Sequence, residues 1–161
     1  MSRIMCLILG LVLGVALMIA RGSLQEQMRP LSAHDAVKVV LDIQATAWNK
    51  GDLEGFMQGY WQDDQLSFYS GNSIRAGFEE TIARYRQTYQ ANDAEMGQLR
   101  FDDLQFESLS PDIVLVKGRW HLTQSKAMPE GLFTLIVKRF PHIGWKIVHD
   151  HTSKACAEDK K

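Results

Sequence analysis

The residues best suited to chemistry lie together near the C-terminal end of the sequence, between Trp145 and Ser153. Apolar and β-branched residues begin this stretch and polar residues end it, a pattern that predicts a β-strand. Because side chains alternate between the two faces of a strand, His149 and His151 share one face and Asp150 points to the other. Such a group at a strand end indicates a pocket at the end of a sheet. The alternative is that neighbouring groups satisfy these side chains by hydrogen bonding.

Asp150 is the carboxyl group best placed to act as a general base, if it lies in an apolar cavity that raises its pKa. Arg119 and His121 lie together on another predicted strand. An arginine among apolar neighbours can bind the carboxylate of an acidic ligand through two parallel hydrogen bonds. The alternative is an ion pair between Arg119 and either Asp150 or Glu79. Arg75 and Arg84 are weaker candidates for ligand binding, since both could lie on the surface.

The histidines permit one further interpretation, in which His149 and His151 chelate a metal ion with His121 as a third ligand. No cysteine or carboxylate with a recognised spacing accompanies them. We therefore expect hydrogen-bonded histidines, with no metal and no cofactor.

The elements that must position these residues follow the order α-α-β-β-α-β-β-β-β. The helices are expected from Ser32 to about Lys50, in a short segment after Asp52, and from Phe78 to Tyr89, and the strands over 66–70, 73–76, 99–109, 113–123, 132–140 and 145–153. Long strands in succession predict an antiparallel sheet with the helices on one face, an α+β fold. Four aromatic residues are expected to wall a cavity between the layers, although aromatic residues at such spacing more often belong to the core: Trp48, Tyr60, Phe68 and Tyr85.

Composition limits the classes of function. The chain has 161 residues, 45% of them apolar and 23% charged, with a formal net charge of -1. This balance fits one globular domain with a short extension, and it lacks the basic patch of a nucleic-acid-binding protein. Of the two cysteines, Cys6 lies in the first segment and Cys156 in a polar tail over 154–161, so no disulfide is expected within the domain.

Residues 1–22 have the pattern of a signal peptide, or of an uncleaved N-terminal membrane anchor. Arg3 precedes an uncharged apolar segment from Ile4 to Ala20, and small residues follow. A polar linker over 23–31 then leads to the domain. We expect an exported protein, periplasmic or secreted, that contacts a membrane only if this anchor is retained.

Four motifs carry a resemblance to a known family. They are Trp48-Asn49-Lys50-Gly51-Asp52, Gly118-Arg119-Trp120-His121-Leu122-Thr123, Gly131-Leu132-Phe133-Thr134-Leu135 and Trp145-Lys146-Ile147-Val148-His149-Asp150-His151-Thr152-Ser153. Together they resemble the nuclear-transport-factor-2-like (NTF2-like) superfamily, in its SnoaL-like branch, over residues 32–153. The last motif also resembles the association domain of calcium/calmodulin-dependent protein kinase II.

The resemblance implies a cone-shaped fold, in which a strongly curved antiparallel sheet wraps around about three helices and leaves a pocket between them. It implies that Arg119, Asp150 and Thr152 face this pocket. Strand alternation places Trp145 and Ile147 on the other face of their strand, with the two histidines. The superfamily contains binding, assembly and catalytic proteins, so the fold does not fix the function. We expect an exported domain that binds a small apolar or acidic molecule. The alternatives are a lyase, isomerase or cyclase with Asp150 as base, and a dimeric interaction module with a vestigial pocket.

The resemblance also implies a homodimer through the outer face of the sheet. If Arg119 and His121 face the pocket, the opposite face of their strand is strongly apolar. That face carries Val114, Val116, Trp120 and Leu122. Because such a patch is too apolar to remain exposed, we expect it to be covered by a second copy of the chain.

Overall fold

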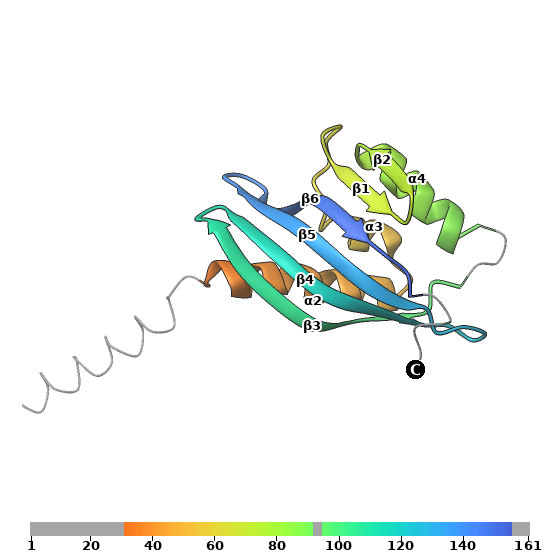
Figure 1. Cartoon of the computed structure of the whole chain (residues 1–161). Helices are drawn as coiled ribbons and strands as arrows, with labels where there is room; N and C mark the ends of the chain where they lie inside the picture. The colour runs from red at the N-terminus through yellow and green to blue at the C-terminus, as the bar shows by residue number, and fades with distance from the viewer. Residues whose placement is uncertain (1–30, 92–94, 156–161) are drawn as a thin grey trace, which may run out of the picture. The chain divides into compact units, whose positions relative to one another are not determined.

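A computed structural model of the protein describes residues 31–91 and 95–155 (Figure 1). The elements are α2 (Ala33–Asn49), α3 (Leu53–Met57), β1 (Ser67–Ser70), β2 (Ser73–Ala76), α4 (Phe78–Tyr89), β3 (Gln98–Ser110), β4 (Ile113–Thr123), β5 (Glu130–Phe140) and β6 (Gly144–Thr152). The expected export segment, most of the linker, and Cys156 with most of the tail lie outside the described residues. Within the described ranges, no helix is long and apolar enough to cross a membrane.

The strands form one six-stranded sheet in the order β2-β1-β6-β5-β4-β3. All neighbouring strands pair antiparallel except β1 and β6, which run parallel. Figure 1 shows the long strands β3 to β6 as a curved layer, with α2 lying along one face of it. The expected α+β fold, with a curved sheet around three helices, is confirmed.

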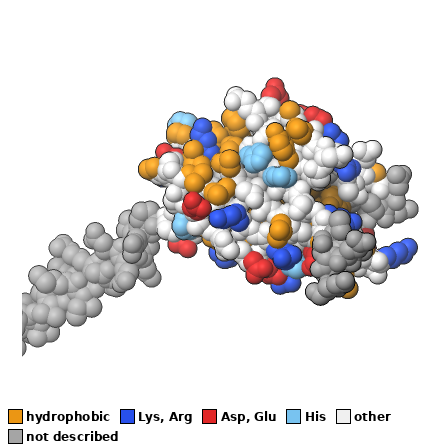
Figure 2. Space-filling view, viewed as in Figure 1, with side chains coloured by type: hydrophobic (Ala, Val, Ile, Leu, Met, Phe, Trp, Pro, Cys, Tyr) orange, Lys and Arg blue, Asp and Glu red, His pale blue; other side chains and the backbone are white. Residues whose placement is uncertain are grey.

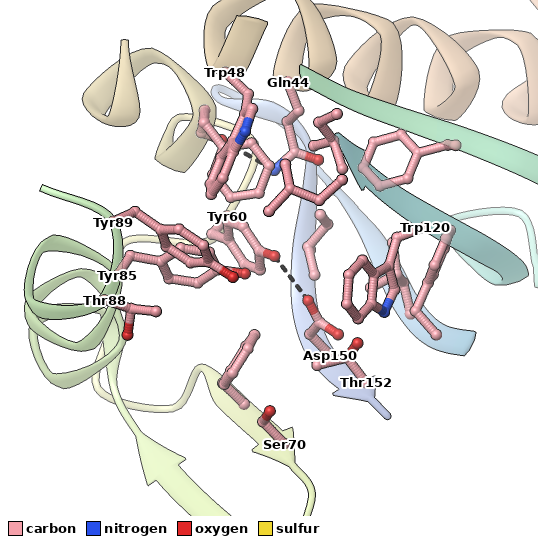
Figure 3. A pocket seen from close by; sticks show the side chains of 18 of the residues that line it. Gln44, Trp48, Tyr60, Ser70, Tyr85, Thr88, Tyr89, Trp120, Asp150 and Thr152 are labelled. Carbon is pink, nitrogen blue, oxygen red and sulfur yellow. Dashed lines mark hydrogen bonds between the residues drawn. The ribbon is translucent and has the colours of Figure 1, made fainter. Parts of the chain in front are cut away.

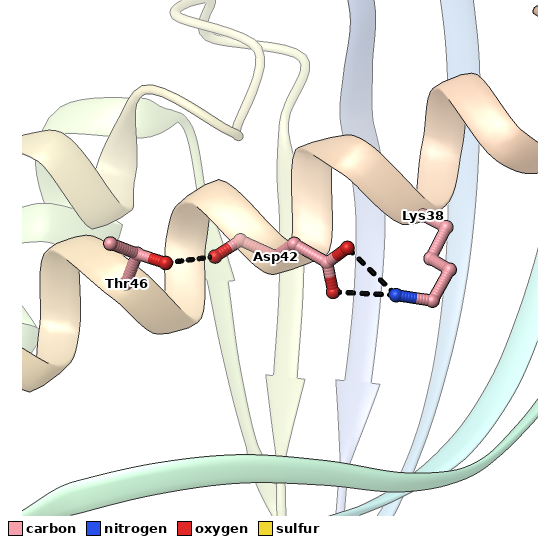
Figure 4. Close-up of polar contacts among 3 residues, drawn as sticks. All are labelled: Lys38, Asp42 and Thr46. Atoms are coloured by element: carbon pink, nitrogen blue, oxygen red, sulfur yellow. Dashed lines mark hydrogen bonds and ion pairs between the residues drawn. The ribbon is translucent and has the colours of Figure 1, made fainter.

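Helix α2 covers the inner face of the sheet because its apolar side chains repeat at helical spacing. The expected cap is present, since the Ser32 hydroxyl accepts a hydrogen bond from the Asp35 backbone N–H at 3.1 Å. The buried side of the helix carries Val37, Leu41, Gln44 and Trp48. The opposite side carries polar contacts beside two exposed apolar residues, Val39 and Ile43. Lys38 Nζ lies 2.7 Å from Asp42 Oδ2, and Thr46 donates to the Asp42 carbonyl (Figure 4).

The expected orientation of β4 is wrong. Val114, Val116 and Leu122 are buried in the core with Trp120 packed against it, so this apolar face meets the helices and not a second copy. The physical reason is that packing these apolar side chains into the core removes them from water. The expected homodimer remains a prediction, but the surface proposed for it is wrong.

The second half of the outer face of β4 is polar, and acidic residues of β3 and β5 compensate its charges. Lys117 Nζ lies 3.4 Å from Glu107, and His121 lies 3.1 Å from Asp102 and 3.0 Å from Glu130. Figure 2 shows acidic and basic side chains close to one another over the face that it displays.

A β-bulge in β6 also overturns part of the expected alternation. His149 pairs with Ile136, and Ile147 pairs with the next residue of β5, Val137, so Val148 is an extra residue in the ladder. Ile147, which is 1% exposed, therefore shares the inner face with Asp150 and not the outer face with His149. Simple alternation fails here because the bulge shifts the register by one residue.

Gly131 allows the chain after β6 to cross β5 closely. A Cβ atom at this position would lie 1.8 Å from the Ser153 carbonyl oxygen and 2.9 Å from Trp120 Nε1. The Trp120 indole N–H donates to that same carbonyl at 3.1 Å. A side chain at Gly131 would therefore displace the segment that ends β6.

Gly131→Ala should lower the free energy of unfolding by about 3 kcal/mol, because the added methyl group would overlap the Ser153 backbone and displace the segment that ends β6. Gly71→Ala is the comparison, since nothing lies within 4 Å of its Cβ position. It should cost only about 1 kcal/mol, through its positive φ. Urea denaturation of both variants measures the difference, and an unchanged midpoint for Gly131→Ala would contradict the described packing.

Candidate functional site

A cavity of about 360 Å³ lies between the inner face of the sheet and the helices (Figure 3). Its lining is mainly aromatic and aliphatic and contains one acidic residue, Asp150. The lining residues come from α2, α3, α4 and from every strand except β2, with Tyr60 and the segment after β6 in addition. Cavities of roughly 300–1,000 Å³ with few polar groups are the usual sites for small molecules.

Asp150 is the polar centre of this cavity. Its side chain is buried, and the Tyr60 hydroxyl donates a 2.7 Å hydrogen bond to Oδ2. The other carboxyl oxygen, Oδ1, is buried and has no hydrogen-bond partner among the described residues. An unpaired buried acceptor of this kind costs about 1–3 kcal/mol.

The backbone of residues 59–61 places Tyr60 beside Asp150. The Gly59 carbonyl accepts from the Ile147 N–H, and the Trp61 N–H donates to the Ile147 carbonyl, both at 2.9 Å. These two bonds pair Tyr60 with β6 next to the bulge, beyond the end of the β1 ladder. Tyr60 is thus held at the position from which its hydroxyl reaches the carboxyl group (Figure 3).

Burial raises the pKa of Asp150 to about 7, and the hydrogen bond from Tyr60 lowers it only in part. Burial and the negative charge of Asp150 raise the pKa of Tyr60 well above its usual value. Tyr60 therefore remains a hydrogen-bond donor at neutral pH, while Asp150 exchanges between its neutral and ionised forms. A carboxyl group in this state can accept or return a proton near pH 7.

The aromatic residues expected to wall the cavity all line it: Trp48, Tyr60, Phe68 and Tyr85. The Tyr85 ring packs against Trp48, Phe56 and Phe68 with centroid separations of 5.4–6.0 Å. Thr152 also lines the cavity, two residues beyond Asp150 on the same face of β6. Whether these residues bind a ligand stays a prediction.

The expected positions of Arg119 and His121 are wrong. Both lie on the outer face of β4, where Arg119 Nε is 3.7 Å from Asp103 and His121 lies between Asp102 and Glu130. Neither residue lines the cavity, and Arg119 does not pair with Asp150. The reason is the orientation of β4: its alternate residues are the apolar ones that fill the core.

The histidine pair lies on the outer face of β6, as expected. His149 Nδ1 and the Ser67 hydroxyl are joined by a 2.7 Å hydrogen bond, and the Tyr69 ring packs against His149 and His151. Among the described residues, no group of three or more His, Cys, Asp or Glu side chains could hold a metal ion.

Several cavity residues were missed by the sequence analysis. Trp120 was missed because β4 was assigned the wrong face, although Trp120 follows the two-residue spacing of the valines on that strand. Tyr89 lies on the same helical stripe as Tyr85, so its spacing carried a usable signal. Gln44 also falls at helical spacing with Trp48, but its polar side chain did not indicate a cavity position. It is 1% exposed, and its side-chain amide donates to the Phe56 carbonyl at 3.0 Å.

Comparisons with known proteins support the same fold. No family model and no curated protein matches the sequence. Among solved structures, an NTF-2-like protein of unknown function from Shewanella oneidensis is 39% identical. That match covers 74% of this chain and 98% of the other, with a TM-score of 0.69.

Two more distant structures show the fold alone. One, from Thiobacillus denitrificans, is named for the association domain of calcium/calmodulin-dependent protein kinase type II; it is 20% identical over 74% of this chain and 94% of its own, with a TM-score of 0.62. The other is an NTF2-like protein of unknown function from Pseudomonas putida, 15% identical over 80% of this chain and 92% of its own, with a TM-score of 0.63.

The buried carboxyl group predicts a specific pH dependence of stability. The folded state holds a proton on Asp150 up to about pH 7, whereas the unfolded chain releases it near pH 3.8. The stabilisation from this proton is complete below about pH 4 and is lost as the pH rises to about 7. A pKa difference of this size corresponds to about 4 kcal/mol.

Asp150→Asn removes this dependence, so its unfolding free energy relative to the unsubstituted protein should rise by about 4 kcal/mol between pH 4 and pH 8. Urea denaturation across this range measures the effect. Asp103→Asn is the matched control, because that side chain is 77% exposed, and its effect should change by less than about 1 kcal/mol. Parallel curves for Asp150→Asn and the unsubstituted protein would contradict a raised pKa.

Proposed function

The protein belongs to the NTF2-like family, and from that premise and the geometry of its cavity we propose that it binds a small, largely apolar molecule against Asp150. The observation that carries the proposal is the buried Oδ1 atom, which lacks a partner among the described residues in an otherwise apolar cavity. A hydrogen-bonding group of a bound molecule would pair with this oxygen and offset the cost of its burial.

The chemistry of the walls indicates what the molecule must be like. The Trp48 indole N–H donates to the Met96 carbonyl at 3.0 Å. The Trp120 indole N–H and the Gln44 side-chain amide also donate to backbone carbonyls. These donors are therefore occupied within the protein, and the walls offer mainly aromatic and aliphatic surface. The ligand needs an apolar body and one hydrogen-bonding group directed at Asp150.

The expectation of an acidic ligand rested on Arg119, which lies outside the cavity. A collapsed or charge-lined pocket would have favoured the alternative of a dimeric interaction module. The cavity is open and its buried lining is apolar apart from Gln44 and Asp150, so its character favours ligand binding over a vestigial pocket.

A second function, proton transfer, is favoured by the pKa of Asp150, which lies close to neutral pH. In this reaction the Asp150 carboxylate would take a proton from an activated C–H bond and return it to another atom of the same molecule. The substrate would be isomerised without net gain or loss of atoms, and Tyr60 would stay protonated and orient the carboxylate. The protein would then be a small-molecule isomerase, or a lyase if a leaving group departs after the first step.

Binding is tested by native mass spectrometry of the protein purified from its own host. We expect an additional mass that is lost on collisional activation, and its absence after Thr152→Trp, which fills the cavity beside Asp150. His151→Trp is the matched control, because it places the same indole on the adjacent residue, which lies on the opposite face of β6. Equal loading of both variants would contradict binding in this cavity. Circular dichroism establishes that each variant is folded.

Proton transfer is tested on the recovered molecule by incubating it with the protein in deuterium oxide. Deuterium incorporation should rise with pH and reach half of its maximum near pH 7, because the carboxylate form is the base. Asp150→Asn should abolish it. Exchange that persists in this variant would exclude Asp150 as the base while leaving the binding proposal intact.

A further inference from the structure

The lining of the cavity divides into a buried interior and an exposed rim. Five lining residues are exposed, and all five are polar: Ser70, Arg84, Thr88, Ser153 and Lys154. Figure 3 shows two of them, Thr88 on α4 and Ser70 on β1, on the side of the cavity away from Trp48 and Gln44. These five residues are called the rim from here on, and they mark where a bound molecule would meet water.

The rim carries two cations and no carboxylate. Arg84 comes from α4 and Lys154 from the segment after β6, so the two charges approach the cavity from different elements. The acidic lining residue, Asp150, lies in the interior and is partly neutral near pH 7. The rim is therefore a positively charged entrance to an apolar cavity, an arrangement that attracts anions.

Arg84 differs from the other arginines in the described part of the chain. The five others each have a carboxylate within 4 Å: Arg75, Arg86, Arg100, Arg119 and Arg139. Arg84 has no carboxylate of a described residue within this distance; its Nη1 donates to the Thr88 hydroxyl at 2.7 Å. Lys154 likewise forms no ion pair with a described residue.

The charge of Arg84 reaches into the cavity. It lowers the pKa of the Tyr89 hydroxyl, although burial raises that pKa by more. Tyr89 packs edge-on against Trp48 with a centroid separation of 4.8 Å, so it belongs to the aromatic wall. The guanidinium group thus lies beside the apolar space and is not paired with a carboxylate of the described residues.

We infer that the molecule bound in the cavity is an organic anion, with its charged group at the rim between Arg84 and Lys154, its apolar body along the aromatic walls and its hydrogen-bonding group at Asp150. This inference rests on the proposed function and narrows it to amphipathic anions such as aromatic or aliphatic carboxylates. Arginine suits this role because its planar guanidinium group can bind a carboxylate through two parallel hydrogen bonds. The reverse orientation would bring the anion against the Asp150 carboxylate in an apolar space, where the repulsion is strong.

The inference is tested with two fluorescent probes that differ by one charge: anilinonaphthalene sulfonate, and phenylnaphthylamine, which is the same molecule without the sulfonate. Their affinities are measured by fluorescence titration at low ionic strength, where exposed ion pairs are least screened. The variant is Arg84→Gln with Lys154→Gln. The control is Arg86→Gln with Lys138→Gln, which removes the same charge from exposed positions that do not line the cavity.

The rim variant should weaken sulfonate binding about tenfold, as expected for two exposed ion pairs, and change amine binding by less than about twofold. The control should leave both affinities within about twofold, and Thr152→Trp should prevent both probes from binding. If the rim variant and the control weaken sulfonate binding equally, the inference is overturned. If the amine still binds to the cavity in that case, the proposed function stands. If neither probe binds the unsubstituted protein, or if both still bind after Thr152→Trp, both proposals fail.

Discussion

The hydrogen bond from Tyr60 to Asp150 is the interaction on which the interior of this domain depends. It holds a carboxyl group in the core, where solvation that favours ionisation is lost. One oxygen is satisfied by the tyrosine, and the other has no partner among the described residues. Filling the same volume with an apolar side chain would remove this cost. The aromatic walls, the raised pKa and the proposed ligand site all follow from the way in which this group is buried.

The backbone around β6 makes this burial possible. The bulge at Val148 turns Ile147 and Asp150 to the same face, so an aliphatic floor and a carboxyl group lie side by side in the cavity. The bulge also leaves Ile147 beyond the β1 ladder, and the backbone of Gly59 and Trp61 satisfies its polar groups. The bulge thus places Ile147 beside the acid, and the two backbone hydrogen bonds to Ile147 place the donor, Tyr60.

The sequence was a good guide wherever one periodicity held along an element. The helices, the hairpin of β1 and β2 and the four long strands follow from apolar spacing and caps, as the buried face of α2 illustrates. The inward position of Asp150 followed from the family resemblance, and the aromatic wall followed from helical spacing. The face expected for Ile147, which precedes the bulge, was wrong because the alternation of side chains in the sequence does not reveal an extra residue. The expected face of β4 failed because the orientation of Arg119 came from the family resemblance, whereas the valines on the other face of the strand fill the core.

The rim illustrates a different limit of sequence reasoning. Arg84 and Lys154 lie 70 residues apart in the chain, and no local pattern indicates that they meet at one cavity. Their importance follows from partners: the other described arginines have nearby carboxylates, and Arg84 does not. Pairing of this kind depends on which strands become neighbours, and the sheet order decides that.

The protonation state of Asp150 is the quantity that tests this account most directly. Carbon-detected NMR of protein labelled with carbon-13 at aspartate can follow the Asp150 carboxyl resonance through a pH titration, with Asp150→Asn providing the assignment. The account predicts a titration midpoint near pH 7. A midpoint near pH 4, the ordinary value for aspartate, would mean that the carboxyl group is solvated or charge-paired, and would contradict the account.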